Sequence, residues 1–429
     1  MYVAIDDTDS PGGMCTTFLM TEIIGRIGLD LIGLPQLVRL NPNIPYKTRG
    51  NAALCARFGR GTGQSRRIGT IEGKAVLAWS DASESGSTEE LAGLVSEIVG
   101  EMYERHENTN PGIVVSERRF PGWFYQEALK REMRKEEALS IIREIGASFR
   151  EFGNGRGLIG ASAAMSWHPG RRTFELLAYN HYGNTPDNDE KMKIAKWADS
   201  VPGTFSSVDS RHNKALIFPS PRTPVYMGIR STLEESLINI IEPIGAREET
   251  ACERYMIYET NQATDDHIQA DPEILENLMS CSLIAEISSV PEAVQGGHWF
   301  CNAIWNGKTI KAAAFEPSGE LRESFRNLAT GDMVRFFGSY NSAVLNIEKM
   351  EIITLSKEFI RSGGRCRICG GSIESAGKSG VRCRSCGEVR EYYSYSERKR
   401  NLLPGWYEVP ASSRRHLAMP VDLMGIMEQ

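Results

Sequence analysis

The chain begins with a pattern that predicts a strand, a loop and a helix. An apolar run at 2–5 is followed by an acidic loop that contains glycine. From about Thr17 to Ile27, apolar side chains recur at the spacing of one helical face, which predicts a helix. Residues 31–40 and 52–58 have the composition of strands, and a proline-rich loop joins them.

Mixed helices and strands are predicted up to about residue 270. Ser87 and Glu90 form a capping-box pattern before an apolar stripe at 91–102, which indicates a helix packed on the core. A second, charged helix is predicted over 124–145, before a glycine-rich run at 153–160. The remaining predicted elements are strands at 173–178, 215–218 and 225–229 and a helix near 234–241.

From Leu283 onward, the pattern changes to short strands separated by glycine turns. Five strands in this stretch are typical of a small closed β-barrel such as an OB-fold, which commonly holds nucleic acid. A β-domain that serves only as a spacer is the alternative, because a fold does not fix a function. The predicted strands are 283–287, 299–304, 310–315, 333–340 and 343–353.

The composition excludes a membrane protein and favours several globular domains. At 429 residues the chain exceeds what one hydrophobic core normally organises, so about two to four domains are expected. Hydrophobic residues make up 41% and charged residues 24%, and no segment approaches the ~18 consecutive apolar residues of a membrane span. The acidic N-terminus lacks the basic and apolar regions of a signal peptide, so we expect a cytoplasmic protein.

Charge is distributed unevenly along the chain. The net charge is −6, but residues 357–415 carry 13 Lys and Arg against 6 Asp and Glu. That stretch is therefore positive by 7, and the rest of the chain is negative by 13. A basic end on an acidic body suggests a polyanion held at one end, although a merely solvated charged tail explains the charge equally well.

Four of the nine cysteines form the most specific motif in the sequence. The pairs Cys366, Cys369 and Cys383, Cys386 are each of the Cys-x-x-Cys type and are followed by glycine. Four thiolates at this spacing can close a tetrahedral zinc site, whereas a redox dithiol would need only one pair. Because four thiolates leave no open coordination position, such a zinc ion stabilises a fold and performs no catalysis.

Basic and aromatic residues surround this predicted zinc module. Their combination suits phosphate contacts together with base stacking, so RNA binding is the expected use of the module. The residues are Arg365, Arg367, Arg382, Arg384 and Arg390, with Tyr392, Tyr393 and Tyr395 after them.

A second motif places Asp6, Asp7 and Asp9 directly after the first strand, before Thr16 and Thr17 at the start of a helix. Clustered carboxylates suit a divalent cation, and hydroxyl groups at a helix N-terminus can face phosphate, so a magnesium–nucleotide site is one interpretation. An Asx-turn with an ordinary threonine cap is the other.

Lys47 and Arg49 would add positive charge near such a site, or would simply be solvated. The run from Gly155 to Gly160, with Gly157 between them, matches G-x-G-x-x-G, but we reject a nicotinamide site because no clear strand–turn–helix context surrounds it. A loop against phosphate, which would make Gly155 and Gly157 ATP-binding residues, and a simple tight turn both remain open.

Together these motifs resemble one family over essentially the whole chain, the archaeal 2-agmatinylcytidine synthetases that act on the minor isoleucine tRNA with a CAU anticodon. The segments that carry the resemblance are 5–10, 14–17, 46–51, 155–160, 260–267 and the four-cysteine motif. The resemblance implies an α/β and α+β multidomain protein with a kinase-like catalytic domain at 1–205, a ferredoxin-like domain at 206–275, an OB-fold at 276–356, a zinc ribbon at 357–400 and a tail at 401–429.

The resemblance also implies the reaction. ATP phosphorylates the C2 oxygen of the wobble cytidine at position 34, because this amide-like oxygen is a poor leaving group, and the amine of agmatine then displaces the phosphate. The implied cofactors are ATP, Mg²⁺ and a structural Zn²⁺. The threonine that the family phosphorylates corresponds to Thr16, with Thr17 as the less suitable neighbour, and the family's aspartates correspond to Asp6, Asp7 and Asp9.

For agmatine the sequence offers Thr264, Asp265 and His267 as candidate contacts, with a structural turn as the equal alternative. Two other functions remain open. One is a different ATP-dependent RNA-modifying enzyme, and the other is a non-catalytic RNA-binding protein with an OB-fold and a zinc ribbon.

Overall fold

The computed structural model of the chain divides into two compact units. Unit 1 comprises Met1–Ser282, Phe337–Ser342 and Glu408–Gln429, and unit 2 comprises Leu283–Phe336 and Ala343–Tyr407. The C-terminal segment therefore belongs to the same unit as the N-terminus. The structure describes residues 1–47, 50–83, 86–180, 187–219, 223–246, 252, 254–362, 364–377, 380–390 and 394–427.

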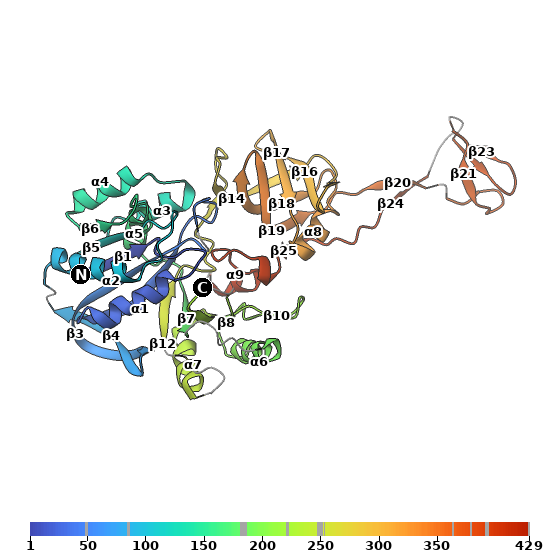
Figure 1. The fold of residues 1–429 in the computed structure, drawn as a ribbon. Coiled ribbons are helices and arrows are strands. Elements are labelled where there is room, and N and C mark those ends of the chain that lie inside the picture. Colours follow the sequence, from blue (N-terminus) through green and yellow to red (C-terminus); the bar gives the residue numbers. More distant parts are fainter. Residues whose placement is uncertain are drawn as a thin grey trace. The chain divides into compact units, whose positions relative to one another are not determined.

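Unit 1 is built on a ten-stranded mixed sheet with the order β6-β5-β1-β3-β4-β2-β12-β7-β11-β8 (Figure 1). Most pairs are antiparallel, but β2 is parallel to both β4 and β12. The strands are β1 (Tyr2–Asp6), β2 (Asp30–Arg39), β3 (Ala52–Ile71), β4 (Lys74–Ser83), β5 (Gly112–Ser116), β6 (Ser148–Glu151), β7 (Thr173–Tyr179), β8 (Thr204–Phe205), β11 (Val225–Ser231) and β12 (Arg254–Thr260), with β9 (Val208–Asp209) and β10 (Lys214–Ala215) as a separate hairpin.

Both faces of this sheet are covered by helices. In β1, Val3 and Ile5 belong to one hydrophobic cluster while Ala4 belongs to the other, because successive side chains point to opposite faces. A strand buried on both faces has an uninterrupted apolar sequence, as 2–5 does. In Figure 1, α1 (Thr16–Arg26) and α2 (Thr88–Met102) cover one face, and α3 (Trp123–Lys130), α4 (Lys135–Ile145) and α5 (Gly157–Ser166) cover the other. The remaining helices of unit 1 are α6 (Asn188–Asp199), α7 (Glu234–Ala246), η3 (Ala411–Ser413) and α9 (Val421–Met427).

Unit 2 contains the predicted barrel. The pairing β14-β18-β19-β17-β16 returns to β14 and closes five strands on themselves. These strands are β14 (Met279–Ile287), β16 (His298–Trp305), β17 (Lys308–Ala314), β18 (Met333–Asn341) and β19 (Val344–Thr354), and the unit boundary falls within β14 and β18. The helix α8 (Gly319–Phe325) and the short strands β13 (Ile268–Ala270), β15 (Glu292–Val294) and β25 (Gly405–Glu408) accompany them.

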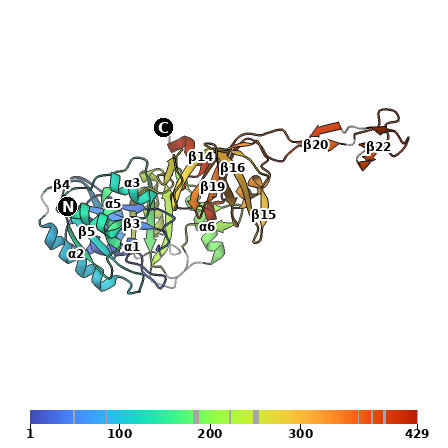
Figure 2. The same ribbon diagram turned by 90° about the horizontal axis from the view of Figure 1, so that it is seen from above.

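The four-cysteine segment forms the end of unit 2. An antiparallel pair, β20 (Phe359–Ser362) and β24 (Ser394–Glu397), leads from the barrel to the small sheet β21 (Ile373–Ser375), β22 (Val381–Cys383) and β23 (Val389–Arg390) (Figures 1 and 2). After β24 the chain is fastened to the barrel by Arg400, whose Nη1 and Nη2 lie 2.6 and 2.8 Å from the two carboxylate oxygens of the fully buried Asp332.

Most predicted elements are confirmed, but three differ from the prediction in their extent. The helix expected over 124–145 is two helices, because Arg131 is extended and Met133 turns into the core, and Glu137 then accepts from the N–H of Arg134 to start α4. The strand expected at 215–218 covers only Lys214–Ala215. The strand expected at 52–58 extends to Ile71, because its polar second half pairs with β4.

Within the described residues, no helix has both the length and the apolar character that are needed to cross a bilayer.

Candidate active site

The acidic loop lies at the end of β1. Asp6 is the last residue of this strand, and Asp7 follows with a φ of 58°. Burial raises the pKa of Asp6 well above its ordinary value, and the neighbouring charge of Asp7 raises it further. One oxygen of Asp7 accepts from Arg156 Nη2 at 3.0 Å and from the N–H of Asn110 at 3.2 Å. Arg156 lowers the pKa of both carboxyl groups but donates its hydrogen bond to Asp7, so a cation beside Asp6 would relieve an electrostatic cost that remains there.

The glycine-rich run packs closely against Asp6. The run follows the strand β6 and leads into the helix α5. The prediction that no strand–turn–helix context surrounds it was therefore wrong. A Cβ atom at Gly160 would lie 1.8 Å from Asp6 Oδ2, and one at Gly157 would lie 2.6 Å from the Asp6 carbonyl oxygen. Gly155 adopts a φ of 69° in the turn. These glycines let α5 approach β1 closely and leave space for the Asp6 side chain.

Thr16 and Thr17 open α1 beside the loop. Thr16 Oγ1 accepts a hydrogen bond of 3.1 Å from Thr8, and Thr17 Oγ1 lies 3.0 Å from Cys15 Sγ. Both threonines are largely buried, yet both line a cavity of about 640 Å³, which we call the large cavity. Asp9 lines it too. The structure thus brings the acidic loop and the threonines to one site.

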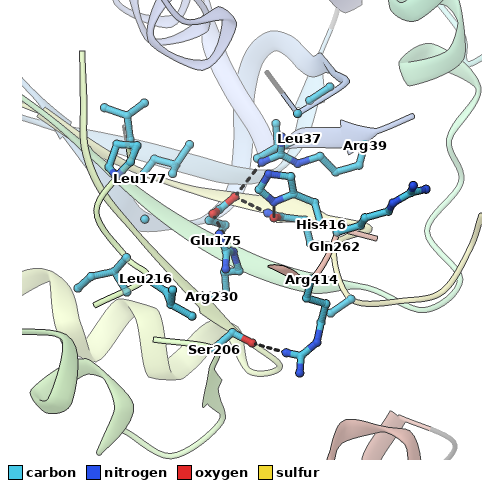
Figure 3. Close-up of a pocket in the computed structure, with 18 of the residues that line it drawn as sticks. Leu37, Arg39, Glu175, Leu177, Ser206, Leu216, Arg230, Gln262, Arg414 and His416 are labelled. Atoms are coloured by element: carbon cyan, nitrogen blue, oxygen red, sulfur yellow. Dashed lines mark hydrogen bonds and ion pairs between the residues drawn. The ribbon is translucent and has the colours of Figure 1, made fainter. Parts of the chain in front are cut away.

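The large cavity is strongly basic at one side and apolar at another (Figure 3). Its acidic lining residues are Asp9 and Glu175, whereas its described basic ones are Arg39, Lys214, Arg230, Arg414 and Arg415. The apolar wall contains Phe205, Leu216, Ile217, Phe218 and Pro219. Such a lining suits an anionic ligand that also has an apolar part.

A hydrogen-bonded relay crosses this cavity. Glu175, which is almost fully buried, lies 3.3 Å from Arg230 Nε and 3.8 Å from Arg39 Nη2. It accepts from the side-chain amide of Gln262, and Gln262 Oε1 lies 3.1 Å from His416 Nδ1. Figure 3 shows these side chains converging from β2, β7, β11 and the C-terminal segment.

A second, narrower cavity of about 140 Å³ lies on the other side of Asp9, and we call it the small cavity. Asp9, Gly50 and Ala52 line both cavities, so the two adjoin there. The small cavity contains Asp6, Asp7 and Glu132 as its other acids, Lys47, Arg131 and Arg156 as its bases, and Tyr46, Leu40, Ile44, Met133 and Ile159 among its apolar groups.

The predicted site residues fall into three groups. The acidic loop, Thr16 and Lys47 line the cavities, whereas Gly155 and Gly157 are absent from both described linings, and of these two only Gly157 packs against the loop. Arg49 lies outside the described residues.

Thr264, Asp265 and His267 are likewise absent from the described linings of both cavities. Thr264 Oγ1 donates to the Asn261 carbonyl at 2.8 Å, and Asp265 Oδ1 accepts from the N–H of Met419 at 2.7 Å. His267 is fully buried. These contacts are compatible with a structural turn, and an agmatine contact by these residues stays a prediction.

The four cysteines of the ribbon do converge. Their sulfur atoms all lie within 4.8 Å of one another, and Cys366 Sγ to Cys386 Sγ and Cys369 Sγ to Cys383 Sγ are both 3.5 Å. Backbone N–H groups of Cys369 and Ile368 lower the pKa of Cys366 to about 6, which favours its thiolate. Zinc–sulfur bonds of about 2.3 Å in a tetrahedron require sulfur spacings close to these, so the residues fit a zinc ion.

Several cavity residues were missed by sequence reasoning. Arg39, Glu175, Arg230, Gln262 and His416 come from distant parts of the chain. One signal was present, because Glu175 interrupts the apolar strand 173–179 and a charged residue in a buried strand requires partners. The others follow only from the tertiary structure.

A cationic cavity beside acidic and hydroxyl groups, in one chain with a five-stranded barrel and a four-cysteine module, defines a class of protein: nucleotide-using enzymes that modify RNA. Comparison with known proteins identifies the member of that class. Family models described as the TiaS TCKD domain and the TiaS FLD domain match residues 2–154 and 155–267. These ranges meet earlier in the chain than the boundary expected at 205.

A TiaS from Thermoplasma volcanium, named as a 2-agmatinylcytidine synthetase of the minor isoleucine tRNA, is 43% identical over 99% of this chain and 97% of its own length. A crystal structure of TiaS in complex with this tRNA and ATP aligns with a TM-score of 0.83 at 34% identity. A second structure, of TiaS with the tRNA, AMPCPP and agmatine, aligns with a TM-score of 0.81 at 32% identity. Both alignments cover 99% of this chain and 97% of the other. The chain belongs to the TiaS family of tRNA-modifying ligases.

Proposed function

We propose that this protein uses ATP to conjugate agmatine to C2 of the wobble cytidine of the minor isoleucine tRNA, with the chemistry performed in the two adjoining cavities of unit 1. Family membership over the full length supports the overall reaction. The observation that carries the assignment of the site is that Thr16 and Asp9 face a cationic cavity large enough for a nucleotide.

The large cavity is the ATP site in this proposal. Its volume of about 640 Å³ lies within the ~300–1,000 Å³ of typical cofactor pockets, whereas the 140 Å³ of the small cavity does not. The apolar wall with Phe205 and Phe218 suits the adenine, and Arg39 and Arg230 suit the triphosphate. In this proposal the γ-phosphoryl group lies toward Thr16, and Lys47 lines the adjoining small cavity.

Magnesium is held at the acidic loop. Within the described part of the chain, Asp6, Asp7 and Asp9 do not form a cluster of three converging metal ligands. Mg²⁺ does not need one, because it is usually bound by one or two carboxylates and the phosphates of its nucleotide. Asp9 borders both cavities, so it is suited to contact such an ion directly, with Asp6 completing the site. Gly155 and Gly157 act here as positioning residues.

Thr16 is the phosphate acceptor. Its hydroxyl group opens α1 and faces the large cavity, where Arg39 and Arg230 can stabilise phosphoryl charge. Thr17, whose hydroxyl group lies against Cys15, is the neighbouring control position. Phosphorylation of the cytidine C2 oxygen must precede amine attack, because that oxygen is otherwise a poor leaving group.

Agmatine fits the small cavity. It is a slender molecule with a cation at each end, and this cavity offers carboxylates together with apolar walls. Glu132 is exposed at the cavity and suits the guanidinium group, while the amine extends toward Asp9. Glu132→Gln should raise the KM for agmatine several-fold without changing phosphorylation of the protein by ATP, and an unchanged KM would remove agmatine from this cavity.

The ribbon holds zinc and grips the tRNA together with the barrel. The four sulfurs fit a closed tetrahedral site, and Arg367, Arg382 and Arg384 are distributed around it. We place the protein in the cytoplasm, where its nine cysteines, which form no disulfide in the structure, would stay reduced.

The deciding experiment for the function is a nucleoside mass spectrum of the minor isoleucine tRNA after treatment with the protein, ATP, Mg²⁺ and agmatine. We expect one agmatine-modified cytidine per tRNA, and none when ATP or agmatine is omitted. ATP turnover without incorporation would favour a different RNA-modifying enzyme, and binding of tRNA without ATP turnover would favour a non-catalytic RNA-binding protein.

A further inference from the structure

The C-terminal segment, expected from the sequence to be a tail, contributes an imidazole to the catalytic unit. Residues from Glu408 onward belong to unit 1, and Ala411, Ser412, Arg414, Arg415 and His416 all line the large cavity. The segment is held in place by the N–H of Ala263, which donates to the His416 carbonyl oxygen at 2.8 Å, and by Leu417, whose carbonyl oxygen accepts from Asp265 at 2.9 Å. His416 is therefore fixed in the cavity by its own backbone.

The relay described above determines which nitrogen of His416 carries hydrogen. An ionised Glu175 can only accept hydrogen bonds, so Gln262 must present its NH₂ group to Glu175 and its oxygen to His416. Nδ1 of His416 must then be the donor in its 3.1 Å contact with that oxygen. In the neutral imidazole, Nε2 is consequently the acceptor.

Nε2 points to where the cavities adjoin. A Cβ atom at Gly50 would lie 2.9 Å from His416 Nε2 and 2.7 Å from its Cδ2, and Gly50 lines both the large and the small cavity. Only glycine at position 50 therefore lets the ring lie this close to the junction of the two cavities. His416 itself is an exposed residue, so its ring is accessible to a ligand at this junction.

We propose that His416 is the general base of the amine-transfer step, an assignment that rests on the proposed function. Agmatine's amine nitrogen bonds to C2 of the phosphorylated cytidine, the bond from C2 to the phosphorylated oxygen breaks, and phosphate leaves with the electron pair. The attacking nitrogen first loses its ammonium proton to water and enters as a neutral NH₂ group, and after the new bond has formed it carries one proton too many. Nε2 of His416 takes up that proton, and the imidazolium returns it to water.

The charges around the imidazole ring keep it neutral, which is the form that can accept a proton. The pKa of His416 is well below its ordinary value, mainly because of Arg39, with desolvation inside the cavity, Arg230 and Lys47 as further causes. Glu175 is the acid nearest to this group, but it contacts Arg39 and Arg230 directly and reaches His416 only through Gln262. His416 is thus neutral at physiological pH and gives up an acquired proton readily.

The test separates amine transfer from phosphorylation in the full-length protein. With the minor isoleucine tRNA, ATP, Mg²⁺ and agmatine, His416→Gln should lower the single-turnover rate of agmatine incorporation by on the order of 10²-fold or more. Phosphorylation of the protein by ATP without agmatine, measured in parallel, should fall much less than agmatine incorporation, although His416 also lines the large cavity. Because the pKa of His416 is lowered, the wild-type rate should stay constant through pH 6.5 and fall only well below the ordinary imidazole pKa of about 6.5, and this decline should be absent in the variant.

Two further measurements guard against a structural explanation. Added imidazole should partly restore incorporation by His416→Ala, because the removed ring leaves room for it. Ser413→Ala, on an exposed neighbour that is absent from the described cavity linings, should behave as wild type.

Incorporation by His416→Gln at the wild-type rate would overturn the assignment. So would an equal loss of protein phosphorylation, which would make His416 a nucleotide contact. If unaltered protein incorporates no agmatine at all, the proposed function itself fails.

Discussion

Replacing Gly160 by alanine should inactivate the enzyme while leaving it folded. The added Cβ atom would lie 1.8 Å from Asp6 Oδ2 and 2.5 Å from its Cγ. Non-bonded atoms approach no closer than about 3 Å, so the carboxylate has to retreat by more than about 1 Å. A displacement of this size at a reacting centre typically costs on the order of 10²-fold in rate.

The expected change in stability is small because two effects oppose each other. Alanine in a helix interior is favoured over glycine by about 1 kcal/mol, whereas overpacking a buried site costs about 1–3 kcal/mol. Gly160→Ala should therefore lower the free energy of unfolding by at most about 2 kcal/mol. Gly93→Ala is the matched control, because Gly93 lies in α2 and an added Cβ would meet nothing within 4 Å.

The assay is the rate of protein phosphorylation by ATP and Mg²⁺, measured beside denaturant unfolding for both variants. Gly93→Ala should raise the free energy of unfolding by up to about 1 kcal/mol and leave the rate of protein phosphorylation unchanged. A Gly160→Ala protein that phosphorylates at the wild-type rate would refute the reasoning, because it would mean that the position of the Asp6 carboxylate does not matter. A loss of rate that is matched by unfolding would refute it as well.

Three more predictions concern other parts of the chain. Thr16→Ala should abolish protein phosphorylation and agmatine incorporation but preserve tRNA affinity, and phosphopeptide mass spectrometry that finds phosphate on Thr17 would move the acceptor by one residue. Cys383→Ser, or a zinc chelator, should weaken tRNA binding in a filter assay while sparing protein phosphorylation, and equal loss of both would contradict that division. Arg400→Gln should destabilise unit 2 by about 3–5 kcal/mol in urea unfolding, since it leaves Asp332 buried without its partner. Although burial alone would raise the pKa of Asp332, hydrogen bonds from Arg400 and from backbone N–H groups lower it, so in the wild type this stabilisation is present above about pH 4 and is lost as the pH falls further.

Local signals in the sequence predicted much of the fold. The apolar run at 2–5, the cap at Ser87, which does accept from the N–H of Glu90, and the five barrel strands each depend on neighbours along the chain, and all are confirmed. The cysteine spacing likewise predicted a cluster that the structure forms. The family resemblance, drawn from several such motifs at once, is confirmed by the comparisons.

The large cavity was beyond the reach of the sequence because its chemistry is assembled over long distances. Arg39 and Glu175 are brought together only because β2 and β7 both pair with β12. His416 follows the whole of unit 2 in the sequence. The prediction of a single helix over 124–145 was wrong for a related reason. Met133 leaves the helical pattern to pack into a core, and the periodicity of the sequence does not reveal that core.

The return of the C-terminal segment to unit 1 sets the order in which activity can arise during synthesis. A ribosome makes the acidic loop and Thr16 first and residues 414–416 only after the barrel and the ribbon have emerged. A chain that stops short, or is cut between Tyr407 and Glu408, lacks the side chains that finish the cavity. If the large cavity binds ATP as proposed, translation delays its completion until the parts proposed to hold the tRNA exist, so truncated products should not hydrolyse ATP unproductively.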